Sequence, residues 1–367
     1  MILLVNPRAT RPKNRRFPLS VMAIGASLPP DVTWEIIDGN RPSADPFAEI
    51  VARVEAAPAG DPVRAIALTV MPGPQLVSAV PLTRRIKERF PHLPIVWGGY
   101  FPSLYPAAVL NAPYVDWAVR GAGDQTFPEL LEVLDGRRDP KTVAGLAFRE
   151  RSGAHWIGRE RSWVGPDELP SPPYHKIPVD DYLQPTYLGR RSGVYQASIG
   201  CPYGCKFCGV ISVYGSREKL QAPERTARDL AFLARNHGMD SLHFYDNNFF
   251  VKEDHAVELC ERITPLDLAW WCEARIDALL RFGDSTWSAL RRAGLKMVFL
   301  GAESGSDEVL ARMNKRLTTA ETLEIAGRAR AHGIIPEFSF VLGDPENAEQ
   351  EIENTLRFIR RDRKSVV

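Results

Sequence analysis

Three cysteines lie within eight residues of one segment, Gly200-Cys201-Pro202-Tyr203-Gly204-Cys205-Lys206-Phe207-Cys208-Gly209. Their spacing, with three residues inside the first pair and two inside the second, lets a tight loop turn all three sulfurs toward one point. Thiolates bind zinc and iron–sulfur clusters. A closed zinc site needs a fourth protein ligand, whereas a catalytic cluster can leave one iron open. The segment therefore predicts a metal site with an open position.

Disulfides and structural zinc are the less reactive alternatives for this segment. Five cysteines among 367 residues do not form the dense pattern of small secreted disulfide proteins. A zinc site would need a further ligand, and the next candidates, His237, Cys260 and Cys272, do not follow at ligand spacing. An iron–sulfur cluster is therefore favoured over structural zinc.

The elements that must position this chemistry begin with alternating strands and helices over the first 140 residues. Short apolar runs that end in turn-forming sequence predict strands at Ile2–Val5, Trp34–Ile37, Ala65–Val70, Ile95–Trp97 and Trp117–Val119. Helical patterns lie between them, most clearly at Leu76–Phe90 and Gln125–Leu134. The alternation predicts an α/β fold with a doubly wound, flavodoxin-like parallel sheet.

Ligands of such sheets bind beyond the carboxyl ends of the strands. The strand ends here are polar or rich in glycine, which lets a bulky ligand approach the backbone. Any single glycine could serve only to form a turn. Taken together, the strand ends predict a ligand site that includes Asn6, Thr69, Val70, Gly98, Gly99, Gly121, Gly123 and Asp124.

The next segment has a different character. Gly145–Arg149 and Ala154–Ile157 flank a Ser152-Gly153 turn and predict a hairpin, and the proline-rich Leu169–Tyr174 predicts an extended, stiff chain. We therefore expect a first domain at 1–140, a connector at 141–187 and a second domain at 188–367.

The second domain repeats one design, in which a helix ends on a glycine and an apolar strand follows. The glycines are Gly238, Gly294 and Gly333, each suited to a left-handed helix cap. Repeated units of this kind build parallel barrels. Strands are predicted at Val194–Ser198, Leu242–Tyr245, Ala269–Ala274, Met297–Leu300 and Phe338–Leu342.

Catalytic groups of parallel barrels lie at the carboxyl ends of the strands. The cysteine segment follows the first predicted strand. Polar residues follow the others, and they are Asp246-Asn247-Asn248, Arg275 with Asp277, Gly301–Ser306 and Gly343–Pro345. For Arg275 and for Glu303, a structural ion pair in the barrel mouth is the alternative to a binding role.

The cysteine motif, with Phe207 before its last cysteine, resembles the radical S-adenosylmethionine (SAM) superfamily, and the resemblance covers most of the chain. It implies that the three cysteines hold a 4Fe-4S cluster whose open iron is chelated by the amino and carboxylate groups of SAM. It also implies cleavage of SAM to a 5′-deoxyadenosyl radical, with electrons from a donor such as flavodoxin or ferredoxin.

The resemblance also implies roles in SAM binding. Phe207 would support the adenine, and the loop of Asp246, Asn247 and Asn248 would receive the methionine amine. Glu303 or Ser304 would bind the ribose or the amino group. Arg275 is a candidate for the methionine carboxylate, because a guanidinium fork matches that group.

The first domain is similar to the cobalamin-binding domain of one large radical SAM subfamily. The matching stretches are Leu68-Thr69, Val96–Gly99 and Gly121–Phe127, although Ala122 and Asp124 depart from the usual Gly-Glu-Gly-Glu. No histidine follows the first predicted strand, and His92 would lie at the opposite edge of the sheet. The similarity implies base-off cobalamin without a histidine ligand, unless the domain has kept the fold and lost the cofactor.

The superfamily barrel is a (β/α)6 barrel. Asn347–Arg361 predicts the fifth helix, and Arg363–Val367 offers at most the start of a sixth strand. We therefore expect a partial barrel, either truncated after the fifth β/α unit or closed by a partner.

The subfamily's most frequent activity implies methyl transfer to an unactivated carbon of a small-molecule or natural-product substrate. Radical cyclisation or oxidative rearrangement is the first alternative, and a non-catalytic cobalamin or cluster sensor is the second. Lys and Arg number 46 against 45 Asp and Glu, which gives no basic field for nucleic acid. No apolar run predicts a membrane span, and no secretory leader is expected at Met1–Val5, so we expect a cytoplasmic protein.

Overall fold

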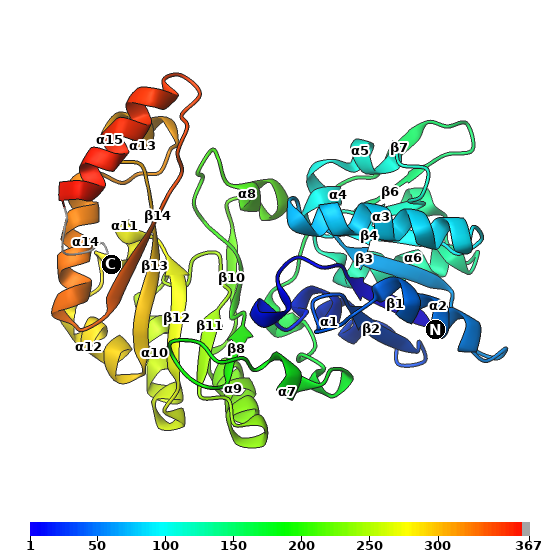
Figure 1. Ribbon diagram of the computed structural model, residues 1–367, viewed down its shortest axis with the longest axis horizontal. Helices are drawn as coiled ribbons and strands as arrows, with labels where there is room; N and C mark the ends of the chain where they lie inside the picture. Colours follow the sequence, from blue (N-terminus) through cyan, green and yellow to red (C-terminus); the bar gives the residue numbers. More distant parts are fainter. Residues whose placement is uncertain (362–367) are drawn as a thin grey trace. The chain divides into compact units, whose positions relative to one another are not determined.

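The computed structural model describes residues 1–361 and divides into two compact units (Figure 1). The first comprises Met1–Val164 and Glu168–Gln184, and the second comprises Gly165–Asp167 and the chain from Pro185 onward. The domain boundaries expected from the sequence stay a prediction. The possible start of a sixth strand at Arg363–Val367 lies outside the described residues.

Five parallel strands form the centre of the first sheet, in the order β2-β1-β3-β4-β5. This is the flavodoxin-like order, and all five strands match the sequence prediction. Their bounds are β1 Ile2–Asn6, β2 Trp34–Asp38, β3 Ala65–Thr69, β4 Ile95–Gly98 and β5 Trp117–Val119. The helices are α1 Leu19–Ala26, α2 Pro46–Ala56, α3 Pro74–Arg89, α4 Tyr100–Leu104, α5 Pro106–Leu110, α6 Gly123–Leu134 and α7 Val179–Tyr182.

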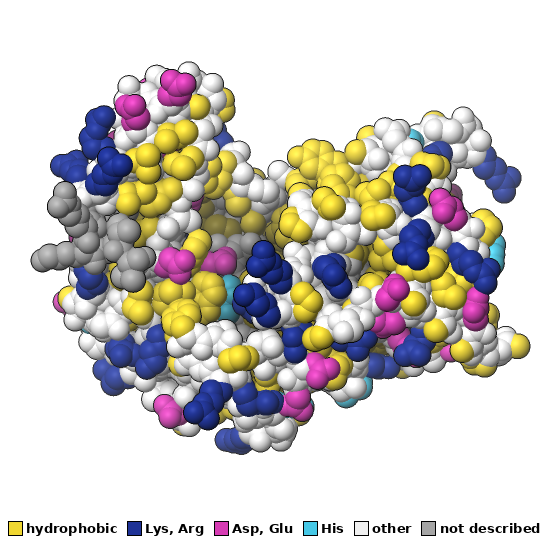
Figure 2. Space-filling view, viewed as in Figure 1, with side chains coloured by type: hydrophobic (Ala, Val, Ile, Leu, Met, Phe, Trp, Pro, Cys, Tyr) yellow, Lys and Arg dark blue, Asp and Glu magenta, His cyan; other side chains and the backbone are white. Residues whose placement is uncertain are grey.

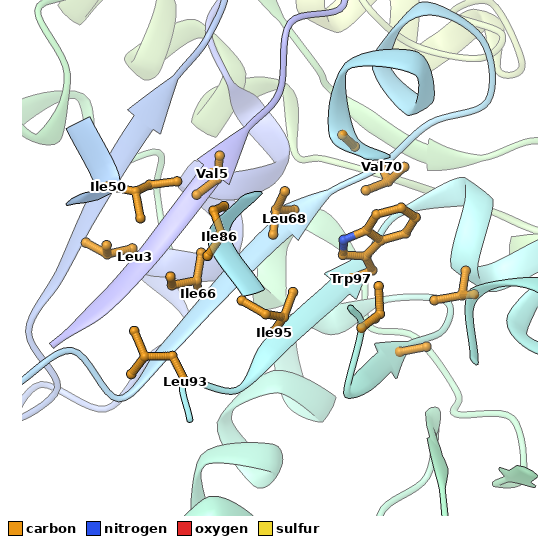
Figure 3. Packing of buried hydrophobic residues seen from close by; sticks show 14 of the residues in the cluster. Leu3, Val5, Ile50, Ile66, Leu68, Val70, Ile86, Leu93, Ile95 and Trp97 are labelled. Atoms are coloured by element: carbon orange, nitrogen blue, oxygen red, sulfur yellow. The ribbon is translucent and has the colours of Figure 1, made fainter. Parts of the chain in front are cut away.

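Alternating side chains give this sheet two hydrophobic cores. Leu3, Ile66 and Trp97 lie on one side with Ile50 of α2 and Ile86 of α3, as Figure 3 shows. The residues between them on the strands, such as Ile2 and Leu4, belong to the other core with side chains of α1 and α6. Burial on both faces explains why these strands read as continuous apolar runs.

The predicted hairpin is present and extends the first sheet. It consists of β6 (Leu146–Arg149) and β7 (His155–Ile157), and β6 pairs antiparallel with β5. The sequence placed these residues in a connector, because a hairpin pattern alone does not reveal which sheet edge it covers.

The second sheet has five parallel strands in the order β14-β13-β12-β11-β8 within the described residues. All five predicted strands are present, as β8 Ser192–Tyr195, β11 Ser241–Phe244, β12 Ala269–Ala274, β13 Leu295–Glu303 and β14 Ile335–Phe340. A separate antiparallel pair joins β9 (Ser198–Gly200) to β10 (Glu218–Leu220). The helices are α8 Gly209–Tyr214, α9 Pro223–His237, α10 Glu253–Ile263, α11 Ile276–Leu279, α12 Asp284–Arg292, α13 Asp307–Arg312, α14 Thr319–Ala331 and α15 Ala348–Arg361.

The three glycines that were predicted to end helices take positive φ, at 61° for Gly238, 99° for Gly294 and 69° for Gly333. A Cβ atom at Gly294 would lie 1.9 Å from the carbonyl oxygen of Leu268. Glycine is therefore required there both by conformation and by space.

The short 3-10 helices are Pro12–Asn14, Pro140–Thr142, Pro166–Glu168, Tyr174–Lys176 and Thr264–Leu266. Among residues 1–361, none of the helices has both the length and the hydropathy of a membrane span.

Candidate functional site

The cysteine loop connects β9 to α8. The Cys201 amide donates to the carbonyl of Arg217 at 2.9 Å, and the Cys208 amide donates to the carbonyl of Cys205 at 3.2 Å. Cys205 is buried, while Cys201 and Cys208 are half-buried. Residues 1–361 contain no three Cys, His, Asp or Glu side chains already gathered as ligands of one ion. Convergence of the three sulfurs thus stays a prediction from their spacing.

A segment more than 100 residues later fixes the shape of this loop. The Asn314 side chain donates from Nδ2 to the Gly204 carbonyl at 2.7 Å, across 110 positions of sequence. The amide of Lys206 donates to the carbonyl of Met313 at 3.0 Å. Asn314 was not predicted from the sequence, because the residues of the cysteine loop do not indicate which distant residue contacts them.

Arg275 follows β12 and contacts the cysteine loop directly. Its Nη1 donates to Cys205 Sγ at 3.0 Å, and its Cζ lies 3.9 Å from the centre of the Tyr203 ring. Asp277 pairs with its Nε at 2.8 Å, and the Lys315 carbonyl accepts from its Nη2. These contacts hold the guanidinium between the cysteine loop and the end of β12.

The loop after β11 joins three strand ends. Asp246 is fully buried and accepts the Ala197 amide at 3.0 Å, and burial raises its pKa to about 7. Asn248 accepts the Arg275 amide at 3.1 Å through Oδ1. Its Nδ2 is buried and has no hydrogen-bond partner among the described residues, so this donor is available to a ligand. Asn247 donates to the carbonyl of Gly200, beside Cys201, at 3.5 Å.

Glu303 and Ser304 lie at the end of β13 and already have protein partners. Glu303 accepts from Lys315 Nζ at 2.6 Å, both side chains are buried, and Glu303 has φ of 63°. Ser304 is fully buried and donates to Glu351 of α15 at 3.1 Å. Phe207, by contrast, is 44% exposed, and the ammonium of Lys315 lies 5.9 Å from its ring centre.

Glu218 on β10 is a second unusual carboxyl group that the sequence did not indicate. Burial, and then the charge of Asp246, raise its pKa to about 8. Its Oε1 is buried without a hydrogen-bond partner within residues 1–361. Only the pairing of β10 with β9 brings Glu218 to the cysteine loop, and that pairing follows from the fold.

The first unit gathers its predicted site residues at the carboxyl edge of its sheet. The Val70 amide donates to Gly98 at 2.8 Å, which links the ends of β3 and β4. Gly99 has φ of 97°, and a Cβ atom there would lie 3.0 Å from the Val70 carbonyl and 3.2 Å from Thr69 Oγ1. Glycine is therefore required at this point, because any side chain would contact Val70 and Thr69 and would need a positive φ.

The predicted residues Gly121, Gly123 and Asp124 follow β5, which pairs with β4. The Gly121 amide donates to Ser103 at 2.8 Å, and a Cβ atom at Gly123 would lie 2.8 Å from Ile24. Burial raises the pKa of Asp124 above its usual range.

Asn6, at the end of β1, belongs to a buried polar network. Its Nδ2 donates to Asp38 at 2.9 Å, and its Oδ1 accepts from Gln75 at 2.8 Å. Asp38 also accepts from Tyr182 at 2.8 Å. No sequence pattern indicated Gln75, which links the loops after β1 and β3 by donating to Asn6 and accepting the Met71 amide at 2.8 Å.

Comparison with known protein families agrees with the two units. Residues 9–131 match the B12 binding domain, and residues 195–359 match the radical SAM superfamily.

Two curated relatives and one solved structure illustrate the similarity. An uncharacterized methyltransferase of Pyrococcus horikoshii is 28% identical over 73% of this chain and 58% of its own. The anaerobic magnesium-protoporphyrin IX monomethyl ester cyclase of Synechocystis is 28% identical over 97% of this chain and 71% of its own. The cobalamin-dependent SAM radical enzyme OxsB, solved with aqua-cobalamin bound, has a TM-score of 0.80 at 19% identity, over 97% of this chain and 51% of its own. This chain thus spans little more than half the length of the first relative and of OxsB.

Proposed function

Because this chain belongs to the radical SAM proteins that carry a B12-binding domain, we propose that it forms part of a cobalamin-dependent radical SAM methyltransferase. The substrate would be a small or natural-product molecule with an unactivated carbon. The observation that carries the proposal is the buried hydrogen bond from Arg275 to Cys205, within a Cys201, Cys205 and Cys208 loop bordered by polar strand ends.

The residues of the loop suit a 4Fe-4S cluster. Three thiols in one loop are an iron–sulfur donor set, and Arg275 donates a hydrogen bond to the sulfur of Cys205. Tyr203 packs over the Arg275 guanidinium and accepts a hydrogen bond from Arg281 at 3.0 Å. When bound, the cluster and SAM would supply a 5′-deoxyadenosyl radical, and cobalamin would supply the methyl group.

The chain's own polar groups would bind and orient SAM. The unpartnered Nδ2 of Asn248 can donate to an acceptor such as a carboxylate, and the exposed Phe207 ring offers a surface for adenine. Arg275, already bound to Cys205 and Asp277, would act by holding the loop, with the methionine carboxylate as a further partner. Glu303 would need to exchange Lys315 for a ligand hydroxyl or amine.

Cobalamin would bind at the carboxyl edge of the first sheet. Glycine at position 99 lets the segment after β4 lie close to the Val70 carbonyl. The proposed contacts lie at the ends of parallel strands, and they are Asn6, Thr69, Val70, Gly98, Gly99, Gly121, Gly123 and Asp124. The first unit contains His92, His155 and His175, and none follows β1, so cobalamin would bind without a histidine ligand from that position. The base-off form is what the family resemblance implies. Replacing all three with Ala should leave the absorption spectrum of bound cobalamin unchanged. Loss of a spectral feature would identify a histidine ligand.

The decisive experiment is anaerobic reconstitution with iron and sulfide, followed by incubation with SAM that carries a labelled methyl group, a flavodoxin or ferredoxin reductant and cobalamin. We expect 5′-deoxyadenosine to form. Cys201→Ala, Cys205→Ala and Cys208→Ala should each lose bound iron and SAM cleavage. Cys260→Ala is the matched control, because Cys260 is buried in α10 outside the loop, and it should keep both.

Ring formation or oxidative rearrangement is the second candidate, and the similarity to a cyclase over 97% of this chain favours it. It predicts 5′-deoxyadenosine without transfer of the labelled methyl group. A non-catalytic cobalamin or cluster sensor would not cleave SAM. If the reconstituted protein holds iron but yields no 5′-deoxyadenosine with any reductant, the enzymatic proposal is wrong.

A further inference from the structure

The two faces of the second sheet differ in chemistry. On one face, side chains of β11, β12 and β13 such as Phe244, Trp270 and Leu300 are fully buried. On the other, parallel pairing aligns His243 with Trp271 and Met297, and aligns Glu273 with Phe299 and Glu337. Residues paired in this way share a face, and positions two apart on one strand share it too.

Aromatic rings make up much of this second face. The His243 and Trp271 rings are stacked, with centroids 3.5 Å apart and planes 11° from parallel. The Tyr245 ring centre lies 4.4 Å from that of His243, and Tyr245 is 40% exposed. Tyr187 contacts the same face, because its hydroxyl donates to Met297 Sδ at 2.8 Å. Stacking fixes these rings before any ligand arrives.

Two carboxylates flank the rings. Glu273 is 39% exposed at its side chain and lies 3.5 Å from His243 Nε2. Glu337 is exposed, and after burial its charge is the cause that raises the pKa of Tyr187 to about 12. Among the described residues, no Lys or Arg lies within ion-pair distance of either glutamate. The face therefore carries negative charge that the described part of the chain does not neutralise.

We propose that this aromatic–acidic face, formed by Tyr187, His243, Tyr245, Trp271, Glu273 and Glu337, binds a substrate that carries a protonated amine beside an aromatic or apolar body. Cations are attracted to the faces of aromatic rings and to carboxylates, and rings held in place lose little entropy on binding. Figure 2 shows acidic, histidine and hydrophobic side chains side by side on the second unit. Binding of the amine does not depend on the proposed function. Only the identification of this ligand as the substrate rests on it.

The test uses the full chain and three probes of nearly equal shape, namely 2-phenylethylamine, 2-phenylethanol and phenylacetate. Calorimetry at pH 7.5 needs neither cluster nor SAM cleavage, so its outcome is independent of the methyltransferase proposal. We expect the amine to bind about tenfold more tightly than the alcohol, and the anion to bind more weakly than both. The double variant Glu273→Gln/Glu337→Gln should abolish the preference for the amine.

A matched double control is Glu308→Gln/Glu353→Gln, which removes the same charge from exposed positions on α13 and α15. This control should keep the tenfold preference. Trp271→Leu should weaken the amine and the alcohol together. Equal binding of the three probes would overturn the proposal, as would a preference that survives in Glu273→Gln/Glu337→Gln. Displacement of the amine by SAM would show that the face binds SAM, and this result would also overturn the proposal.

Discussion

Arg275 donates a hydrogen bond to Cys205 Sγ at 3.0 Å, across 70 positions of sequence. The bond joins the end of β12 to the cysteine loop and places a buried positive charge on one proposed cluster ligand. The sequence indicated Arg275 as a residue for the SAM carboxylate. Its contacts indicate that it also acts on the sulfur itself.

The reduction potential of the reconstituted cluster should therefore depend on Arg275. Hydrogen bonds to cluster sulfurs tune this potential, and a positive charge favours the more negative, reduced state. Arg275→Met should lower the midpoint potential, by about 60 mV for each tenfold loss in relative stability of the reduced state. Arg275→Lys, which keeps the charge, should lower it less. A redox titration followed by electron paramagnetic resonance measures both, and an unchanged potential in Arg275→Met would contradict this role.

Glu218 should make the stability of the metal-free protein depend on pH. Its pKa rises from 4.5 to about 8 on folding, so the folded protein holds a proton that the unfolded chain has released between these values. The free energy of unfolding should therefore fall as the pH rises through this interval. Glu218→Gln should reduce this fall by about 2 kcal/mol, less than the full shift because the group is only partly buried. Urea unfolding at pH 5 and pH 8.5 measures this decrease in both proteins. An equal decrease in the wild-type protein and in Glu218→Gln would refute the raised pKa of Glu218.

Two glycine substitutions should have opposite effects on stability. A Cβ atom at Gly305 would lie 2.6 Å from Phe358 Cβ and 2.7 Å from Thr355 Cα, both on α15. Gly305→Ala should therefore cost roughly 1–3 kcal/mol of unfolding free energy by displacing α15. Gly327 lies within α14 with no atom near its Cβ position. Gly327→Ala should stabilise the protein by about 0.5–1 kcal/mol. Thermal or urea unfolding distinguishes them, and similar effects of the two variants would show that Gly305 does not set the packing of α15.

Gly99 should be required for cobalamin and not only for folding. Gly99→Ala places a Cβ atom 3.0 Å from the Val70 carbonyl at φ of 97°. Gly136 also has a positive φ, of 72°, but has open space around its Cβ position, so Gly136→Ala matches the backbone strain alone. Both variants should lose stability, Gly99→Ala more than Gly136→Ala because of the close contact with Val70, while only Gly99→Ala should lose cobalamin. Bound cobalamin is measured by absorption after gel filtration. If Gly99→Ala retains cobalamin, Gly99 is not part of the proposed site.

Local patterns in the sequence were sufficient to predict all ten parallel strands. Short apolar runs such as Ile2–Val5 mark buried strands, and capping glycines such as Gly238 mark helix ends. Side chains also alternate along β12, since Trp270 is fully buried and Trp271 is not.

Partners distant in sequence could not be predicted in this way. The contacts of Asn314 with Gly204, of Gln75 with Asn6, and of Glu303 with Lys315 depend on how loops meet at a sheet edge. The periodicity of apolar residues in the sequence does not predict these contacts between loops. The raised pKa of Glu218 likewise depends on the pairing of β10 with β9.

The anchoring of Gly204 by Asn314 has a consequence for the order of events during synthesis. The three cysteines leave the ribosome about 110 residues before the side chain that fixes their loop. Until that later segment has emerged and folded, the thiols lack this support, and a nascent chain would offer them as separate ligands to any metal that is present. Cluster assembly should therefore follow translation of residue 315 rather than accompany that of the cysteine loop.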